Sequence, residues 1–122
     1  MTKGYIGIEN NKPDAIKLMT EKAAQYPGIE VVPLQVKYPQ GGEKQLIDAV
    51  IGRQVPAPPA IPINVGAVVQ NVGTAFAVYQ AVQKNKPLFE RVITVTGKSL
   101  SKPSNFLARI GTPMKQLIDA CG

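Results

Sequence analysis

Histidine is absent from this sequence, and cysteine occurs once, as Cys121. Without histidine, the chain cannot use an imidazole as a general acid, a general base or a metal ligand. A single cysteine cannot form an internal disulfide, which favours a reducing, cytoplasmic setting. Because neither a histidine nor a second cysteine is present to activate Cys121, we expect its side chain to pack in a core. We therefore assign no catalytic and no metal-ligating residue.

Long hydrophobic runs are also missing. No apolar stretch approaches the roughly 20 residues that a helix needs to span a bilayer, and the first residues lack the pattern of a signal peptide. We therefore expect the chain itself to be soluble, without a transmembrane segment. Its 122 residues, 44% of them hydrophobic, can bury one ordinary core, or one core with a small incomplete appendage.

Aromatic residues are few, at 6% of the chain, and they do not alternate with the basic residues. The formal net charge of +6 raises the question of nucleic acid, but the 14 lysines and arginines are spread along the whole length. A protein that binds single strands needs aromatic side chains on which bases stack. Of the two interpretations, a solvated charged surface and a nucleic-acid face, we predict the first.

Two corners, each leading from an apolar strand into a helix, are the most informative part of the sequence. The first covers residues 38–46 and contains the pair Gly41-Gly42, and the second covers residues 68–74. A sharp turn into a helix leaves backbone N–H groups free, and glycine lets a ligand approach the backbone closely. In an open α/β sheet such corners lie side by side at the carboxyl ends of the strands. The sequence therefore predicts part of a nucleotide or flavin site.

The first two thirds of the chain alternate between strand and helix. Short apolar or β-branched runs predict three strands, at residues 5–8, 29–36 and 66–69. Helical spacing and stop signals predict three helices, over residues 13–26, 43–51 and 72–84. Between them, four prolines within residues 55–63 predict an extended crossing segment. Strands that alternate with helices favour a β-α-β-α-β-α run with a parallel sheet.

The pattern changes beyond Pro87. Residues 91–96 and 106–110 predict two further strands, and Thr112-Pro113 predicts the cap and first turn of a last helix. This β-β-α run favours a second unit, so we expect domains at 1–88 and 89–122. The second unit has too few strands to close a core, and we interpret the chain as a fragment of something longer.

Each candidate residue in the first corner has a functional and a structural interpretation. Glu43 can orient a ribityl, ribose or nicotinamide group, or can simply complement the dipole of the helix that it opens. The pair Gly41-Gly42 can admit a ligand, or can serve an ordinary left-handed turn. Tyr38 can stack on a ring or close the edge of the core.

The second corner contains Asn71, which is well placed to cap the helix over residues 72–84. Its side-chain oxygen is expected to accept a hydrogen bond from the Thr74 amide. A capping residue of this kind needs no ligand to explain it. Only the two corners taken together favour a binding site.

Five segments carry a wider resemblance, and they are residues 5–15, 37–46, 69–75, 90–97 and 109–113. In this order and spacing they resemble the C subunit of the Rnf (Rsx) ion-translocating electron transport complex, over nearly the whole chain. Residues 38–52 also resemble the Tyr-x-x-Gly-Glu-Glu helix opening of the flavin-carrying, NADH-oxidising subunit of respiratory complex I. Residues 71–74 resemble the Asn-Asn-Val-Glu-Thr corner of that subunit. Gly42 departs from the double glutamate of its motif.

The resemblance implies an α/β fold in two parts. The first is the C-terminal part of a Rossmann-like FMN- and NADH-binding domain, and the second, from about residue 90, is the start of a β-grasp, soluble-ligand-binding unit. Three residues would lie against flavin or nicotinamide, namely Tyr38, Gly41 and Glu43. Three others would hold the ribityl phosphate or the ring edge of the flavin, namely Gln70, Asn71 and Thr74. The cofactor-binding set that we predict also includes Gly42 and Lys44.

The function implied is that of a peripheral subunit on the cytoplasmic side of the cell membrane. It would pass electrons between NADH and iron–sulfur clusters through FMN, in a complex that couples ferredoxin:NAD chemistry to ion translocation. Its partners would be the other membrane subunits, with ferredoxin or NADH as electron donors or acceptors. The glycine-rich flavin loop and the cysteine runs that hold [4Fe-4S] clusters in that family are not among these 122 residues. We therefore expect the isolated piece to be inactive and to bind little FMN.

Two other hypotheses remain open. In one, the chain is a non-catalytic module that docks its parent protein onto membrane partners through the β-grasp portion. In the other, it belongs to a related soluble electron-transfer protein of the proline reductase type.

Overall fold

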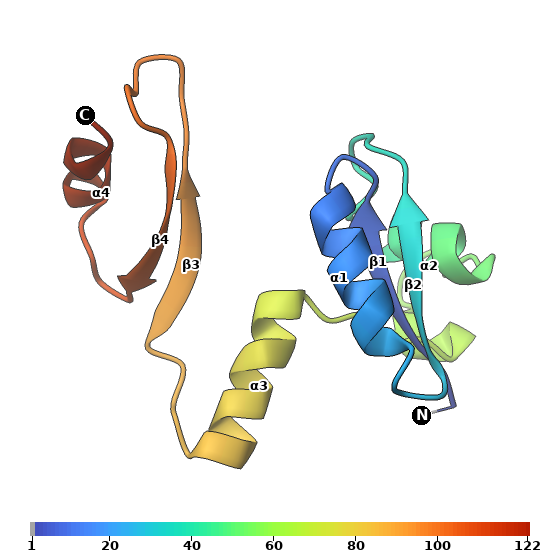
Figure 1. Ribbon diagram of the computed structural model, residues 1–122. Helices are drawn as coiled ribbons and strands as arrows, with labels where there is room; N and C mark the ends of the chain where they lie inside the picture. Colours follow the sequence, from blue (N-terminus) through green and yellow to red (C-terminus); the bar gives the residue numbers. More distant parts are fainter. Residues whose placement is uncertain (1) are drawn as a thin grey trace. The chain divides into compact units, whose positions relative to one another are not determined.

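The computed structural model describes residues 2–122, and the fold is mixed α/β (Figure 1). In chain order its elements are β1 (Gly4–Glu9), α1 (Pro13–Ala23), β2 (Ile29–Leu34), α2 (Glu43–Ile51), the 3₁₀ helix η1 (Pro62–Val65), α3 (Val72–Lys84), β3 (Glu90–Val95), β4 (Ser104–Arg109) and α4 (Met114–Cys121). The chain divides into two compact units, Met1–Val69 and Gln70–Gly122. Within residues 2–122, no helix combines the length and the apolar character that crossing a membrane requires.

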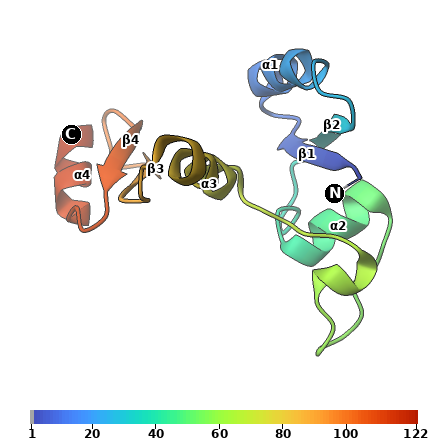
Figure 2. The same ribbon diagram turned by 90° about the horizontal axis from the view of Figure 1, so that it is seen from below.

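The first unit is built on a parallel pair of strands. β1 and β2 pair in register from Gly4 opposite Ile29 to Glu9 opposite Leu34. The crossover helix α1 has a proline in its first turn, as expected, and α2 ends at Gly52 in the left-handed conformation, with φ of 64°. Figures 1 and 2 show α1 and α2 on opposite faces of the sheet. The carboxyl end of β2 therefore leads directly toward the corner that opens α2.

The expected third strand at residues 66–69 is wrong, because the backbone here makes local turns instead of a ladder. Pro62–Val65 forms η1, and Gly66 ends it with φ of 73°. The amides of Gly66 and Ala67 donate to carbonyls within that turn, and Val68 is 72% exposed. The parallel sheet described for residues 2–122 consequently has two strands, and a full Rossmann-like sheet is not formed by them.

The second unit contains α3 and an antiparallel hairpin covered by α4. β3 and β4 pair from Glu90 opposite Arg109 to Val95 opposite Ser104. Leu117 and Cys121 of α4 pack on the hairpin, where the Cys121 side chain is fully buried, as expected for a packing residue. The helix begins at Met114, so its N-cap is Pro113 and not Thr112 as expected, and the Thr112 hydroxyl donates to the Arg109 carbonyl.

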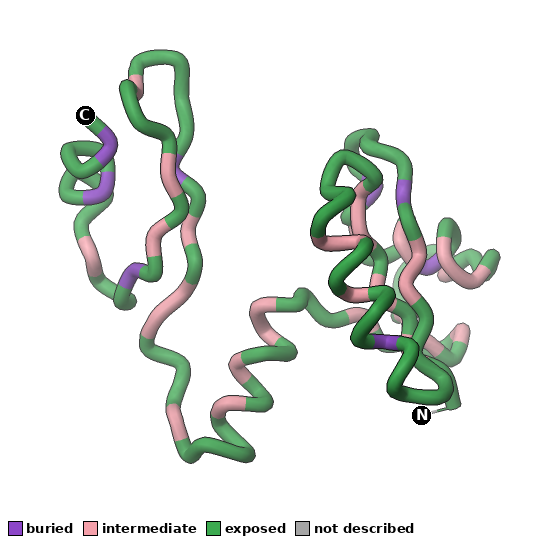
Figure 3. The backbone as a smooth tube through the Cα atoms, viewed as in Figure 1, coloured by how far each residue is buried: buried purple, intermediate pink, exposed green. Residues whose placement is uncertain are grey.

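Buried positions are few in both units (Figure 3). In the first unit the buried apolar residues are Ala23, Leu34 and Ile47. In the second they are Val95, Ala108, Leu117 and Cys121. Four large apolar side chains of α3 do not enter this core, since Val72, Phe76, Tyr79 and Val82 are all exposed. Each core is therefore small, and large apolar surface stays open to other contacts.

Candidate functional site

The first corner is a tight turn that delivers the chain into α2. The amide of Gln40 donates to the Lys37 carbonyl over 2.8 Å, and the amide of Gly42 donates to the Pro39 carbonyl over 2.9 Å. α2 then begins with no side-chain cap at its N-terminus. The first backbone bond of the helix is the one from Leu46 to the Gly42 carbonyl, so the N–H groups that precede Leu46 in the first turn of α2 stay available to a ligand.

The two glycines of this corner are not there for a left-handed turn, because neither has a positive φ. At Gly42 a Cβ atom would collide with the Gln45 side chain and would lie 3.1 Å from the Pro39 carbonyl oxygen. The turn therefore leaves little room for a side chain at residue 42. At Gly41 a Cβ atom would meet no described atom within 4 Å. The backbone at Gly41 is therefore open to the surroundings, and its role in ligand binding stays a prediction.

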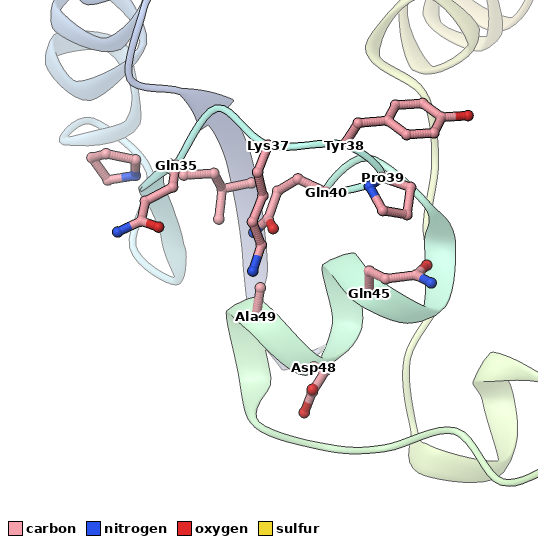
Figure 4. Close-up of a pocket in the computed structure, with 10 residues that line it drawn as sticks. Gln35, Lys37, Tyr38, Pro39, Gln40, Gln45, Asp48 and Ala49 are labelled. Atoms are coloured by element: carbon pink, nitrogen blue, oxygen red, sulfur yellow. The ribbon is translucent and has the colours of Figure 1, made fainter.

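A groove of about 510 Å³ lies between the end of β2, the turn and α2 (Figure 4). Its lining residues are Pro33, Leu34, Gln35, Lys37, Tyr38, Pro39, Gln40, Gln45, Asp48 and Ala49. A second hollow of about 440 Å³ borders the same turn, and its lining adds Glu9, Val36, Gly41 and Gly42. Figure 4 shows the Lys37 side chain directed toward α2, and the Tyr38 ring directed away from it. The turn thus has two concave faces, and α2 lines one of them.

Tyr38 is fully exposed. Of the two roles considered for it, closing the edge of the core is therefore wrong within the first unit. A whole phenol ring in water carries a hydrophobic cost that a stacked ligand would remove.

Gln40 is the residue of this corner that sequence reasoning missed. Its side chain is only 9% exposed and lines both hollows, yet it makes no hydrogen bond to any other described side chain or backbone group. No side-chain nitrogen or oxygen atom of the described residues is both buried and without a partner, so the Gln40 amide group reaches the solvent in the hollows that the residue lines. The only signal in the sequence was its place between Pro39 and Gly41, which does not distinguish a largely buried side chain from an exposed one.

The acidic and basic residues that open α2 differ in what they contact. The Glu43 side chain is exposed and has no hydrogen-bond partner in the described part of the chain, so both of its interpretations stay open. The Lys44 ammonium lies 3.3 Å from the Pro56 carbonyl oxygen. Lys44 is thereby tied to the proline-rich segment and not to the two hollows.

At the second corner Asn71 caps α3, but through a different amide from the one expected. Its side-chain oxygen accepts a hydrogen bond from the Gly73 amide over 2.9 Å, and not from Thr74. The Thr74 hydroxyl oxygen accepts a hydrogen bond of 2.9 Å from the Arg91 guanidinium on β3. Gln70, at the start of this corner, is exposed, so it has no role in the core of its unit.

The structure thus brings the predicted residues together in two groups. Tyr38, Gly41, Gly42, Glu43 and Lys44 share one turn of the first unit, and Gln70, Asn71 and Thr74 share one turn of the second. That the two groups face a common ligand stays a prediction. Over residues 2–122 no three histidine, cysteine, aspartate or glutamate side chains gather in a way that could hold a metal ion.

Comparison with known proteins identifies two domain families in the chain. Residues 1–80 match the Nuo51 FMN-binding domain, and residues 92–122 match the SLBB domain. Between them the matches leave out only a short stretch, which contains the end of α3 and the start of β3.

Individual relatives are similar over almost the whole chain. The C subunit of the proton-translocating ferredoxin:NAD(+) oxidoreductase complex of Clostridium ljungdahlii is 50% identical over 120 residues, which are 98% of this chain and 26% of the relative. The C subunit of the Na(+)-translocating ferredoxin:NAD(+) oxidoreductase complex of Acetobacterium woodii is 44% identical over 98% of this chain and 27% of its own length. The C subunit of the ion-translocating oxidoreductase complex of Serratia proteamaculans is 46% identical over 96% of this chain and 16% of its own. The resemblance to the Rnf C subunit is confirmed, and the chain spans about a quarter or less of these relatives.

Proposed function

The chain belongs to the Nuo51 FMN-binding domain family, and on that premise we propose that the two corners that open α2 and α3 contribute residues to an FMN site in an electron-transfer subunit. The subunit would pass electrons between NADH and iron–sulfur clusters, within a membrane ferredoxin:NAD oxidoreductase complex that is coupled to ion transport. Support for this assembly comes from relatives named as C subunits of ion-translocating ferredoxin:NAD(+) oxidoreductase complexes.

The observation that carries the proposal is the form of the corner at residues 38–43. It combines an uncapped helix N-terminus, a glycine with open space above it, and a fully exposed tyrosine ring. These features fit FMN, which offers a flat ring for stacking and polar oxygens and a phosphate for free N–H groups. Bound there, FMN would supply the step that turns two-electron hydride chemistry into single-electron transfer.

Each predicted site residue then has a defined role. We assign Tyr38 to stacking on the flavin or nicotinamide ring, since its ring has no contact of its own to keep. Gly41 and Gly42 let the ligand approach the turn, and the carboxylate of Glu43 accepts hydrogen bonds from ribose or nicotinamide. At the other corner Gln70, Asn71 and Thr74 hold the ribityl phosphate or the ring edge. Lys44 stays in the proposed cofactor-binding set because it lies in the first turn of the same helix. Its ammonium group donates to the Pro56 carbonyl.

Further parts of the proposal concern the longer protein. The division at 1–88 and 89–122 places the change of domain between the two family matches, which end at residue 80 and begin at residue 92. The β3–β4–α4 segment would begin a β-grasp unit. NAD(H) and [4Fe-4S] clusters would bind the longer protein, which would lie peripherally on the cytoplasmic side of the membrane, among the other subunits of the complex.

A second candidate function is docking, and one observation favours it. Val92 and Leu107 lie directly opposite each other in the hairpin and are 70% and 65% exposed. Paired apolar side chains on an open sheet face are typical of a surface that another chain covers. In this candidate the hairpin binds a membrane partner and the corners bind no cofactor.

The test is a titration of the full-length protein with FMN. Glu43→Ala and Asn71→Ala variants are compared with Glu21→Ala, which removes an exposed carboxylate from α1. We expect weaker FMN binding in the first two and wild-type affinity in the third. Unchanged affinity in both Glu43→Ala and Asn71→Ala would favour the docking module.

A further inference from the structure

A side-chain hydrogen bond from Arg91 joins the hairpin to the second corner. Arg91 lies at the start of β3, outside both matched domains, and is 17 positions from Thr74. One guanidinium nitrogen, Nη2, donates to the Thr74 Oγ1 atom over 2.9 Å. The other, Nη1, lies 2.6 Å from the point that a Cβ atom on Gly73 would occupy. The guanidinium therefore fills the space beside Gly73, and a side chain at this position would require it to shift.

This contact determines what the Thr74 hydroxyl can do. A guanidinium only donates hydrogen bonds, so Thr74 Oγ1 is the acceptor in this pair, and its own hydrogen must be directed elsewhere. Among the described residues that hydrogen has no acceptor. The neighbouring Asn71 side-chain oxygen accepts a hydrogen bond from the Gly73 amide, and the described hydrogen bonds include none from Thr74 to it. Thr74 is thus left as a donor that points away from the guanidinium.

The charge of Arg91 favours the same kind of ligand. The ion pairs within residues 2–122 join Lys12 to Glu9, Lys86 to Glu90 and Lys115 to Asp119, so none of them neutralises Arg91. The first turn of α3 contains no acidic residue either. A positive side chain at the positive end of a helix is repelled by it unless an electron-rich group lies nearby. The corner consequently presents a positive potential and one free hydroxyl donor.

We propose that Arg91 is a positioning residue for the FMN site, which fixes Thr74 as a hydrogen-bond donor to an acceptor oxygen of the bound flavin. This inference depends on the proposed function, because it takes FMN as the ligand of the second corner. It adds a residue from β3 to a site whose other members come from turns that open helices. The SLBB-side hairpin would then contribute to flavin binding through one side chain.

The test is a double-mutant cycle on FMN affinity in the full-length protein. Arg91→Gln and Thr74→Val are measured alone and together, with the melting temperature of each variant. Each single change is expected to weaken FMN binding roughly tenfold, the worth of one charge-assisted hydrogen bond, and the double variant is expected to be no weaker than Thr74→Val. Thr74→Ser keeps the hydroxyl and is expected to bind FMN as the wild type does.

Two variants serve as controls for the arginine. Arg109→Ala removes an exposed arginine from the same hairpin and is expected to leave FMN affinity unchanged. Gly73→Ala keeps Arg91 but forces its guanidinium to move, and it is expected to weaken FMN binding even where Arg91→Gln does not fold. Riboflavin, which lacks the phosphate, is titrated in parallel, and losses seen only with FMN would assign the acceptor to the phosphate.

The outcomes separate this inference from the function on which it depends. Two results would overturn the role of Arg91 alone, provided that Asn71→Ala still weakens FMN binding. One is an additive loss of FMN affinity in the double variant, and the other is wild-type FMN affinity in both Arg91→Gln and Gly73→Ala. Wild-type affinity in Thr74→Val and Asn71→Ala together would overturn the second corner as a flavin site, and the inference with it.

Discussion

Replacing Gly41 by alanine separates ligand binding from folding more cleanly than any other change in this chain. The structure gives Gly41 no positive φ and no described atom within 4 Å of an added Cβ, so alanine fits the folded chain without strain. Gly52 is the matched control, since it also has open space around its Cβ position but adopts φ of 64°. The two glycines thus differ in backbone conformation and not in crowding.

The expected energies follow from this difference. A Gly→Ala change at an unstrained position restricts the unfolded chain and stabilises the fold by about 0.4–1 kcal/mol. At Gly52 the left-handed backbone costs an alanine about 1–2 kcal/mol, which the same entropic gain offsets only in part. We therefore expect Gly41→Ala to raise the free energy of unfolding slightly and Gly52→Ala to lower it by about 0.5–1 kcal/mol.

The assay measures stability and FMN affinity in the same full-length protein. Thermal unfolding gives the first quantity, and quenching of flavin fluorescence gives the second. An added methyl group at residue 41 would lie between the backbone and the ligand, so we expect FMN binding to weaken at least tenfold in Gly41→Ala and to stay unchanged in Gly52→Ala. Wild-type FMN affinity in a stable Gly41→Ala protein would refute the idea that this glycine exists for a ligand.

Three further predictions concern the second unit. Asn71→Asp keeps a capping oxygen for the Gly73 amide, so we expect unchanged thermal stability but weaker FMN binding, because a carboxylate repels a phosphate; equal binding would mean that Asn71 is a cap only. Cys121→Ser places a hydroxyl in the buried core and is expected to lower the free energy of urea unfolding by about 1–3 kcal/mol. A loss smaller than the one measured for Cys121→Ala would contradict this expectation. Lys86→Met breaks the 2.5 Å ion pair with the half-buried Glu90 and is expected to lower the free energy of unfolding by about 1 kcal/mol in the same assay. This loss should be smaller at high salt, and a loss that does not depend on salt would indicate packing instead.

Much of the local structure could be predicted from the sequence because short-range signals decide it. The helix over residues 72–84 and the helix after Gly42 have the expected bounds, since Asn71 and Gly52 determine their ends within one turn. The third strand could not be predicted in the same way. Residues 66–69 have the right composition, but a strand also needs a partner, and the turn through η1 engages the backbone locally.

The turns that open α2 and α3 could be predicted from the sequence, but the contacts of their side chains could not. The corners followed from the change of pattern at Gly41-Gly42 and at Asn71. The burial of Gln40 and the contact of Arg91 with Thr74 did not, because both depend on how distant segments pack. The exposure of Tyr38 could not be predicted either, since the same sequence pattern is compatible with a ring that stacks on a ligand and with a ring that closes the edge of a core.

Hydrogen–deuterium exchange of the backbone amides, with and without FMN, tests the central claim most directly in the full-length protein. The claim is that the turn at residues 38–45 and the turn at residues 70–74 bind one ligand. FMN is then expected to slow exchange at Glu43 and Lys44 and, at the same FMN concentration, at Thr74. Slower exchange at one turn with no change at the other, or no change at either, would contradict it.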